Sequence, residues 1–253
     1  MPSLFRALRS FASLAAGRLY EDAWYFVVDV ALDPSAASGV LPRGLSLTRP
    51  ERASVFFARF EKTSFGSTYD EAGVLFHVKR RFRRGLFSPW MVVNDDVALV
   101  LGREVLGYPK KLAEIALRVD GDDVRAEVSR RGQPLLSLEA TLGSAMPASE
   151  APSVLGPRAY GVRGAFGPHA QQLVTFAPRE RIREVRRATA SLTVHATTAT
   201  EGGVVRDPLA AFGLGRVLDA RLHRIDIRAS LPPRVVGGAS LAFAAKSLGA
   251  RYL

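Results

Sequence analysis

One stretch of this 253-residue sequence combines a helix stop, a stiff turn and two adjacent lysines: Gly102-Arg103-Glu104-Val105-Leu106-Gly107-Tyr108-Pro109-Lys110-Lys111-Leu112. Asp95 and Asp96 precede it and predict the capped start of a short helix over residues 97–106. Gly107 ends that helix, and Pro109 stiffens the exit. The segment therefore presents its lysine pair at the start of a strand.

A lysine fixed at such a junction can face a cavity, where its deprotonated amine can attack a ketone and form an imine. The simpler interpretation of the dipeptide alone is a solvated pair at a strand start. Alternation along the strand places Lys111 in the more apolar set of side chains, so the pattern alone favours Lys111 as the buried amine. The two sets are Lys111, Ala113, Ile115 and Leu117, against Lys110, Leu112, Glu114 and Arg118.

Outside this stretch, most of the chain alternates with period two, which predicts strands. The predicted strands cover residues 24–32, 53–61, 72–79, 90–93, 112–119, 123–129, 134–141, 171–176, 189–197 and 221–229. Residues 207–214 and 240–250 have helical patterns. Many short strands with few helices between them favour a mainly β (α+β) fold built on an antiparallel sheet or barrel.

The domain organisation is expected to be a single domain over residues 1–253. Residues 1–19 carry apolar side chains at helical spacing, which predicts an amphipathic helix packed on its own domain or on a neighbouring subunit. Residues 143–170 are rich in Gly, Pro, Ala and Ser and predict a long connection. Residues 240–250 predict a C-terminal helix.

The composition is that of an ordinary globular protein, with 47% hydrophobic and 23% charged residues. The absence of cysteine excludes disulfides, thiol catalysis and cysteine-ligated metal sites. No apolar run approaches the roughly 18 residues that a membrane helix needs. We therefore expect a soluble cytoplasmic protein with no membrane partner.

The formal net charge is +11, and basic residues cluster in residues 79–84 and 179–187. A basic balance is one feature of nucleic-acid-binding proteins, but no helix-turn-helix, zinc-finger or RNA-binding motif accompanies these runs. Solvated loops or an assembly surface explain them better, so no nucleic-acid partner is expected.

Familiar catalytic motifs are missing. No two histidines lie within five residues of each other, so no helical metal pair exists, and neither a serine-hydrolase elbow nor a phosphate-binding glycine loop is present. The four histidines are His77, His169, His195 and His223. We expect no metal and no cofactor.

The pattern G-R-E-x-x-G-Y-P-K-K over residues 102–111 resembles the signature of the acetoacetate decarboxylase family. Further pieces of that resemblance follow in order from about residue 20 to residue 240: Trp24-Tyr25-Phe26, Val40-Leu41-Pro42, Arg59-Phe60-Glu61, Tyr69-Asp70-Glu71, Asp207-Pro208-Leu209 and the strand around Asp226. The lysine element is specific; the other pieces carry weight by their order.

The resemblance implies a cone-like antiparallel β-barrel that encloses the site, in a homo-oligomer without a cofactor. It implies that Lys110 forms the imine and that Lys111 supports it. It also implies that Glu71 and Glu61 line the cavity, Glu71 for proton transfer and Glu61 for positioning. Tyr108 and Arg59 are expected, with Lys111, to support these catalytic residues.

Two departures from the family pattern affect the expected substrate. Matching on Tyr25-Phe26 places Ala23 where the family's decarboxylases carry an arginine, and the connection between the two glutamates is short. A lost charge-assisted contact costs about 1.5–3 kcal/mol. We therefore expect the protein to trap an oxo acid on Lys110 but to decarboxylate acetoacetate poorly.

The amine of Lys110 must lose its proton before it can attack. A free lysine has a pKa near 10.4, about three units too high for attack at neutral pH. Neighbouring strand residues point to opposite faces, and repulsion at roughly 7 Å lowers a pKa by about 1.7 units, whereas burial can lower it by about 3 to 5. Burial is therefore expected to exceed the effect of Lys111.

Three functions remain compatible with the sequence. The first is an imine-forming lyase that decarboxylates a 3-oxo acid at Lys110, and the second is an aldolase or dehydratase that acts on a pyruvate-like 2-oxo acid through the same lysine. Release of carbon dioxide separates these two. The third is a non-catalytic barrel that binds a small molecule, in which Lys110 has an ordinary pKa and borohydride traps no oxo acid.

Overall fold

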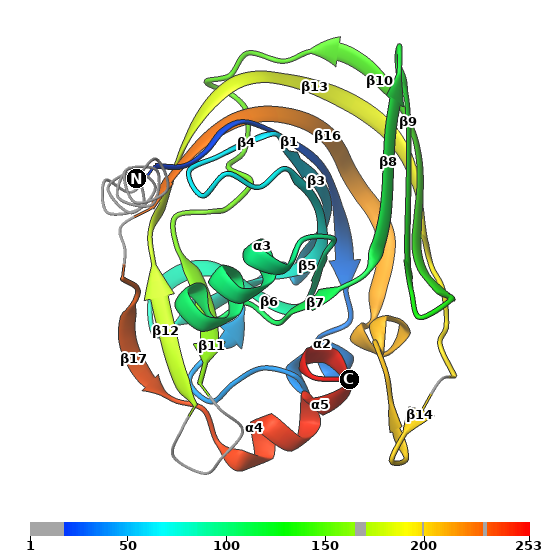
Figure 1. The fold of residues 1–253 in the computed structure, drawn as a ribbon. Helices are drawn as coiled ribbons and strands as arrows, with labels where there is room; N and C mark the ends of the chain where they lie inside the picture. Colours follow the sequence, from blue (N-terminus) through cyan, green and yellow to red (C-terminus); the bar gives the residue numbers. More distant parts are fainter. Residues whose placement is uncertain (1–17, 165–170, 199, 230–231) are drawn as a thin grey trace, which may run out of the picture.

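A single large sheet runs through the computed structural model, which describes residues 18–164, 171–198, 200–229 and 232–253. The sheet has 15 strands, and its main path is β17-β12-β11-β6-β5-β3-β1-β16-β13-β10-β9-β8. Strands β2, β4 and β7 pair with β5, β1 and β6 beside this path, and β14 and β15 form a separate pair. The sheet curls strongly, with α3 inside its curve and α4 and α5 below it (Figure 1).

The described strands are β1 (Arg18–Leu32), β2 (Ser46–Leu47), β3 (Arg52–Phe60), β4 (Lys62–Thr63), β5 (Tyr69–Arg80), β6 (Arg83–Val93), β7 (Lys110–Leu112), β8 (Glu114–Asp120), β9 (Asp123–Arg130), β10 (Gln133–Ala145), β11 (Ala159–Arg163), β12 (Gln172–Phe176), β13 (Pro178–Val194), β14 (Thr200–Glu201), β15 (Val204–Val205), β16 (Leu214–Ala229) and β17 (Arg234–Gly238). The helical elements are α2 (Pro34–Ser38), α3 (Asp96–Val100), the π-helical turn η1 (Leu101–Leu106), the 3-10 turn η2 (Leu209–Phe212), α4 (Leu241–Lys246) and α5 (Leu248–Arg251). The predicted mainly β fold with few helices is confirmed.

Most strand pairs are antiparallel, as predicted, but two are parallel. β6 pairs in parallel with β11 and with the three-residue strand β7. Because β7 lies beside the buried end of β6, the lysine pair is held against the middle of the sheet rather than at a free edge.

The central strands present two different buried faces. Tyr25, Ala58 and Glu71 are directly paired across β1, β3 and β5, so their side chains lie on the same face. The alternate positions, such as Phe26 and Phe57, point to the other face and pack in the larger core with residues of η2 and α4. Both faces are apolar, and the face that holds Glu71 is the one that forms the candidate site.

The basic runs are part of the sheet, which corrects the expectation of solvated loops. Residues 179–187 lie within β13, where Glu180, Ile182 and Val185 alternate with exposed arginines. Residues 79–84 form the hairpin between β5 and β6, where Arg81 has a positive φ of 56° and Phe82 is exposed. The sequence did not predict this part of β13 as a strand, because charged residues lie on both of its faces and obscure the alternation of apolar and polar residues.

Other predicted elements differ in detail. The N-terminal amphipathic helix falls almost wholly on residues outside the described part of the chain. The predicted connection over 143–170 contains β11, and the predicted helix over 207–214 is only the 3-10 turn η2. The C-terminal helix consists of two short helices, α4 and α5, separated by Ser247.

Among the described residues, no helix combines the length and apolar character that a membrane crossing requires.

Candidate active site

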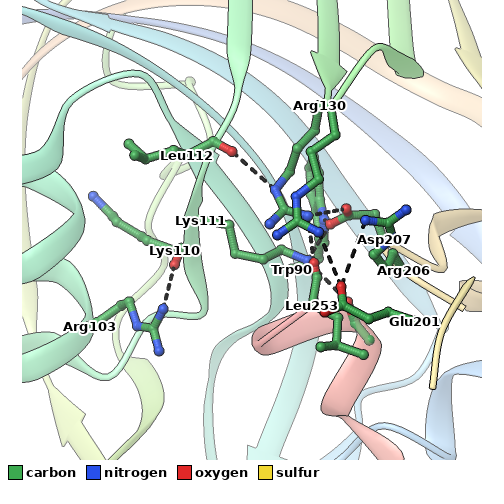
Figure 2. Close-up of polar contacts among 12 residues, drawn as sticks. Trp90, Arg103, Lys110, Lys111, Leu112, Arg130, Glu201, Arg206, Asp207 and Leu253 are labelled. Atoms are coloured by element: carbon green, nitrogen blue, oxygen red, sulfur yellow. Dashed lines mark hydrogen bonds and ion pairs between the residues drawn. The ribbon is translucent and has the colours of Figure 1, made fainter. Parts of the chain in front are cut away.

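The two lysines of β7 point to opposite sides of the sheet. Lys110 and Lys111 are 2% and 3% exposed, so both are buried. Figure 2 shows their side chains diverging, with only Lys111 turned toward Asp207. The alternation had favoured Lys111 as the one buried amine, and this was wrong because Lys110, on the opposite face of β7, is enclosed as well. The interpretation as a solvated pair is also wrong.

Lys110 is paired with Glu71. Its Nζ donates a hydrogen bond to Glu71 Oε2 at 2.6 Å, and both side chains are almost inaccessible to solvent. The pairing follows from strand register, because Lys110 lies beside Met91 on β6 while Glu71 lies beside Val93. The ring of Tyr69 completes the contact, with its centroid 5.4 Å from Nζ. The buried amine and the carboxylate are thus close enough for direct proton transfer between them.

The cavity around this pair is small, with a volume of about 40 Å³, and its wall is mainly apolar and aromatic. No arginine is among the described residues that line it, and Ala23 is fully buried. The lining residues are Leu19, Tyr20, Tyr25, Phe56, Phe60, Glu71, Leu75, Met91, Leu106, Tyr108, Lys110, Leu155, Phe176, Pro178 and Ile227. The wall suits a short, largely apolar molecule with one reactive polar group.

Burial has the largest single effect on the pKa of Lys110, as expected from sequence, but the lowered pKa that was expected is not found. Burial lowers this pKa, but the attraction of Glu71 opposes it, and the net direction is upward. Lys110 is therefore an ammonium group in the resting cavity. Burial also raises the pKa of Tyr20, Tyr25 and Tyr108, so these phenols are neutral hydrogen-bond donors.

The helical segment before β7 explains the glycines of the signature. Asp95 caps α3 by accepting a hydrogen bond from the backbone N–H of Ala98, and Gly107 ends η1 in the left-handed region at φ 77°. A Cβ on Gly102 would lie 2.4 Å from Cδ of Lys110, so the lysine side chain crosses the turn where only glycine leaves room. The predicted helix stop is confirmed. Gly102 belongs to the signature, but the sequence did not indicate that it makes room for the side chain of Lys110.

Lys111 belongs to a different cluster, on the other face. It forms an ion pair with Asp207, which also accepts hydrogen bonds from Trp90 Nε1 at 2.7 Å and from Arg130 at 2.9 Å (Figure 2). Burial lowers the pKa of Lys111 to about 8, and Asp207 opposes that shift. The two lysines point to opposite faces of the sheet, and each pairs with its own carboxylate. Lys111 therefore serves to anchor β7.

We expect Asp207→Asn to lower the free energy of unfolding by about 3–5 kcal/mol, because Lys111 and Arg130 lose the carboxylate that they share in the interior. Urea unfolding measures this. Glu201→Gln is the control, since Glu201 is exposed and bonds Arg131 and Arg206 at the surface, where a pair contributes about 0–1 kcal/mol (Figure 2). Equal effects of the two substitutions would contradict the anchoring role of Asp207.

The other expected site residues are distributed unevenly. Tyr108, expected only as a supporting residue, lines the cavity. Glu61 does not: it is exposed in the turn after β3, so the expectation that it lines the cavity was wrong. Arg59 points away and forms a bidentate ion pair with Asp70 at 2.8 Å and 3.0 Å. A glutamate one residue beyond the end of a strand follows the turn, which here carries it into solvent.

Sequence reasoning missed Tyr20, Tyr25 and Phe56 as wall residues. Tyr20 accepts a hydrogen bond from Tyr69 across two strands, at 3.1 Å between the hydroxyl oxygens. The aromatic alternation of β1 and β3 was a visible signal of burial but not of which face meets the lysine. Within residues 18–164, 171–198, 200–229 and 232–253, no group of three metal-ligating side chains comes together.

Known proteins resemble this chain over most of its length. The family model described as acetoacetate decarboxylase matches residues 7–238. A curated relative, acetoacetate decarboxylase 2 of Mesorhizobium japonicum, is 34% identical over 98 residues, which cover 39% of this chain and 37% of that protein. The matched region thus spans well under half the length of this curated relative.

Solved structures share the fold at low identity. The crystal structure of acetoacetate decarboxylase from Legionella pneumophila matches with a TM-score of 0.78 at 17% identity and covers 88% of each chain. The enduracididine biosynthesis enzyme MppR, complexed with the condensation product of pyruvate and imidazole 4-carboxaldehyde, matches with a TM-score of 0.70 at 18% identity and covers 87% of this chain and 91% of its own.

Proposed function

Because this chain belongs to the acetoacetate decarboxylase family, we propose that it is a lyase in which Lys110 forms a Schiff base with an oxo acid. The observation that carries the proposal is the buried pair of Lys110 and Glu71, 2.6 Å apart in a small apolar cavity. Such an amine can be made nucleophilic by its own partner, with no group supplied from outside.

The proton of the pair is the first part of the mechanism. Transfer from Lys110 Nζ to Glu71 converts an ion pair into a neutral amine and a neutral acid, so no net charge enters or leaves the cavity. The amine then attacks the oxo carbon to form a carbinolamine. Glu71 returns its proton to the carbinolamine hydroxyl, water leaves, and a protonated imine remains.

In the decarboxylase reaction, the bond between the α-carbon and the carboxylate breaks next. Its electron pair moves into the protonated imine, which becomes a neutral enamine, and carbon dioxide leaves. A proton taken up from solvent adds to the enamine carbon and restores the protonated imine. Water then hydrolyses this imine and releases the ketone and the ammonium form of Lys110.

The second candidate is condensation of a pyruvate-like 2-oxo acid with an aldehyde through the same imine. The observation that favours it is the lack of an arginine among the described cavity residues, where Ala23 stands at the position matched to the family's arginine. The neutral hydroxyls of Tyr20, Tyr25 and Tyr108 then provide the donors for the retained carboxylate.

The test is borohydride reduction in the presence of single oxo acids, followed by mass spectrometry of the Lys110 peptide. We expect an adduct on Lys110 with at least one of acetoacetate, longer 3-oxo acids, pyruvate and 2-oxobutyrate, and only slow acetone release from acetoacetate. Carbon dioxide release assigns the decarboxylase reaction, and consumption of pyruvate with an aldehyde assigns the second candidate. If the folded protein forms no adduct with any of these oxo acids, the third function, a non-catalytic barrel that binds a small molecule, is favoured.

We expect Glu71→Gln to lower kcat/KM by about 10²–10⁴-fold, because a glutamine can neither take nor return the proton. The same change removes the main attraction that raises the pKa of Lys110, so the pH at which borohydride trapping is half-maximal shifts downward. Trapping rates measured from pH 5 to pH 10 check both effects.

Glu61→Gln is the matched control, since it changes the same atoms on an exposed glutamate outside the cavity. Its kcat/KM and pH profile are expected to equal those of the parent. A Glu71→Gln protein with parental turnover would refute the assignment of Glu71 as the proton-transfer residue.

A further inference from the structure

The turn at Val154 and Leu155 lies between two cavities of the molecule. Leu155 lines the cavity of Lys110, whereas Val154 lines a second cavity of about 290 Å³. Val154 is 4% exposed and packs into the same apolar cluster as Tyr25 and Phe56. This turn belongs to the segment between β10 and β11, and its two neighbouring residues form part of the partition between the cavities.

Both cavities lie along one face of the sheet. On β1, Tyr25 lines the first cavity, and Val27 and Asp29, the next residues on that face, line the second. On β5, Leu75 lines the first and His77 lines the second. The second cavity is therefore the direct continuation of the lysine cavity along the strands, and it is several times larger.

Glu180 on β13 holds the partition in place. Its carboxylate accepts hydrogen bonds from the backbone N–H of Val154 at 3.0 Å and from that of Leu155, and the hydroxyl of Ser153 also bonds it. No lysine or arginine forms an ion pair with Glu180 among the residues that the structure describes. Both carboxylate oxygens are thus committed to the turn rather than to a cation.

We infer that Glu180 is the residue that limits substrate length, by fixing Leu155 as the end wall of the lysine cavity. The inference rests on the proposed Schiff-base function and narrows its substrate class to short oxo acids, of about the length of acetoacetate or pyruvate. When the turn is released, the lysine cavity opens toward the larger cavity, and an alkyl chain attached to the oxo acid gains room to enter it.

The test is competitive trapping on the full chain. Equal concentrations of a four-carbon and an eight-carbon 3-oxo acid are reduced together with borohydride, and mass spectrometry gives the ratio of the two adducts on Lys110. This ratio is measured within one sample, so a partly unfolded population does not change it. The variants are Glu180→Gln and Leu155→Ala. In Glu180→Gln an NH₂ group replaces one of the two oxygens that accept from the turn, so one of the two N–H groups loses its acceptor. Leu155→Ala shortens the wall without touching Glu180.

We expect the ratio of long to short adduct to rise at least about tenfold in both variants, since each methylene accommodated by a pocket changes selectivity by roughly 10- to 200-fold. The control is Glu184→Gln on the same strand, whose carboxylate is half-exposed and 3.6 Å from Arg224; its ratio is expected to stay at the parental value.

An unchanged ratio in a folded Glu180→Gln protein would overturn the inference, even if Leu155→Ala raises it, because Leu155 would then be a wall that Glu180 does not position. If Glu180→Gln does not fold, an unchanged ratio in Leu155→Ala overturns the inference and a raised ratio supports it. If the parent protein traps only 2-oxo acids, the same ratio is measured with a four-carbon and an eight-carbon 2-oxo acid. Absence of every oxo-acid adduct from the parent protein marks the failure of the proposed function itself, which is a different result.

Discussion

Lys110→Met is expected to abolish the borohydride adduct and all turnover, the largest effect of any substitution in this protein. In the proposed mechanism the Lys110 amine bonds to the substrate, and no other described side chain that lines the cavity carries an amine. Loss of the ammonium also leaves the carboxylate of Glu71 buried without its ion-pair partner. The measurement is the mass of the reduced protein after exposure to the oxo acid that labels the parent.

Lys111→Met is the matched control, because the same atoms are changed one residue along the chain. The side chain of Lys111 points to the opposite face of the sheet (Figure 2). When the amine of Lys111 is removed, Arg130 still pairs with Asp207. Adduct formation on Lys110 is therefore expected to persist in this variant. An adduct mapped to Lys111 in the parent protein would show that the two lysines have been assigned to the wrong faces.

Gly102→Ala is expected to lower kcat/KM by about 10²-fold or more, although Gly102 touches no substrate. The added methyl would lie 2.4 Å from Cδ and 2.5 Å from Cε of Lys110, so the lysine side chain must move. A displacement of about 1 Å at a reacting group can cost about 10²-fold in rate. In the helical turn itself alanine is preferred to glycine by about 1 kcal/mol, so the defect is expected in catalysis rather than in folding.

The control for this substitution is Gly143→Ala. A Cβ there meets its nearest neighbour, the carbonyl oxygen of Arg187, at an ordinary 3.6 Å. Its trapping rate is expected to equal that of the parent, while that of Gly102→Ala falls with little change in the midpoint of urea unfolding. Equal trapping rates for the two variants would show that the path of the Lys110 side chain does not depend on this glycine.

Several properties of the protein are local and were accessible from sequence. Alternation along the chain predicted a mainly β fold, since one strand face is read every second residue. The caps and the left-handed glycine predicted the helix that ends before β7, because these signals depend only on residues close in the chain. The resemblance of residues 102–111 directed attention to Lys110 and to Glu71, which the structure brings together.

Other properties depend on which strands meet, and no local pattern contains that information. Glu61 and Glu71 looked equivalent in sequence, but the turn after β3 carries Glu61 into solvent while the register of β5 against β6 places Glu71 at Lys110. The alternation around Lys111 favoured that lysine alone, because the pattern does not show that Lys110 is also enclosed, in the cavity beside Glu71. Sequence thus determined the mainly β fold and singled out Lys110, whereas the tertiary structure decided which side chains each lysine meets. Asp207 lies 96 residues beyond its partner Lys111, and Glu180 lies 25 residues beyond Leu155, whose turn it binds. Only the curled sheet brings these residues into contact.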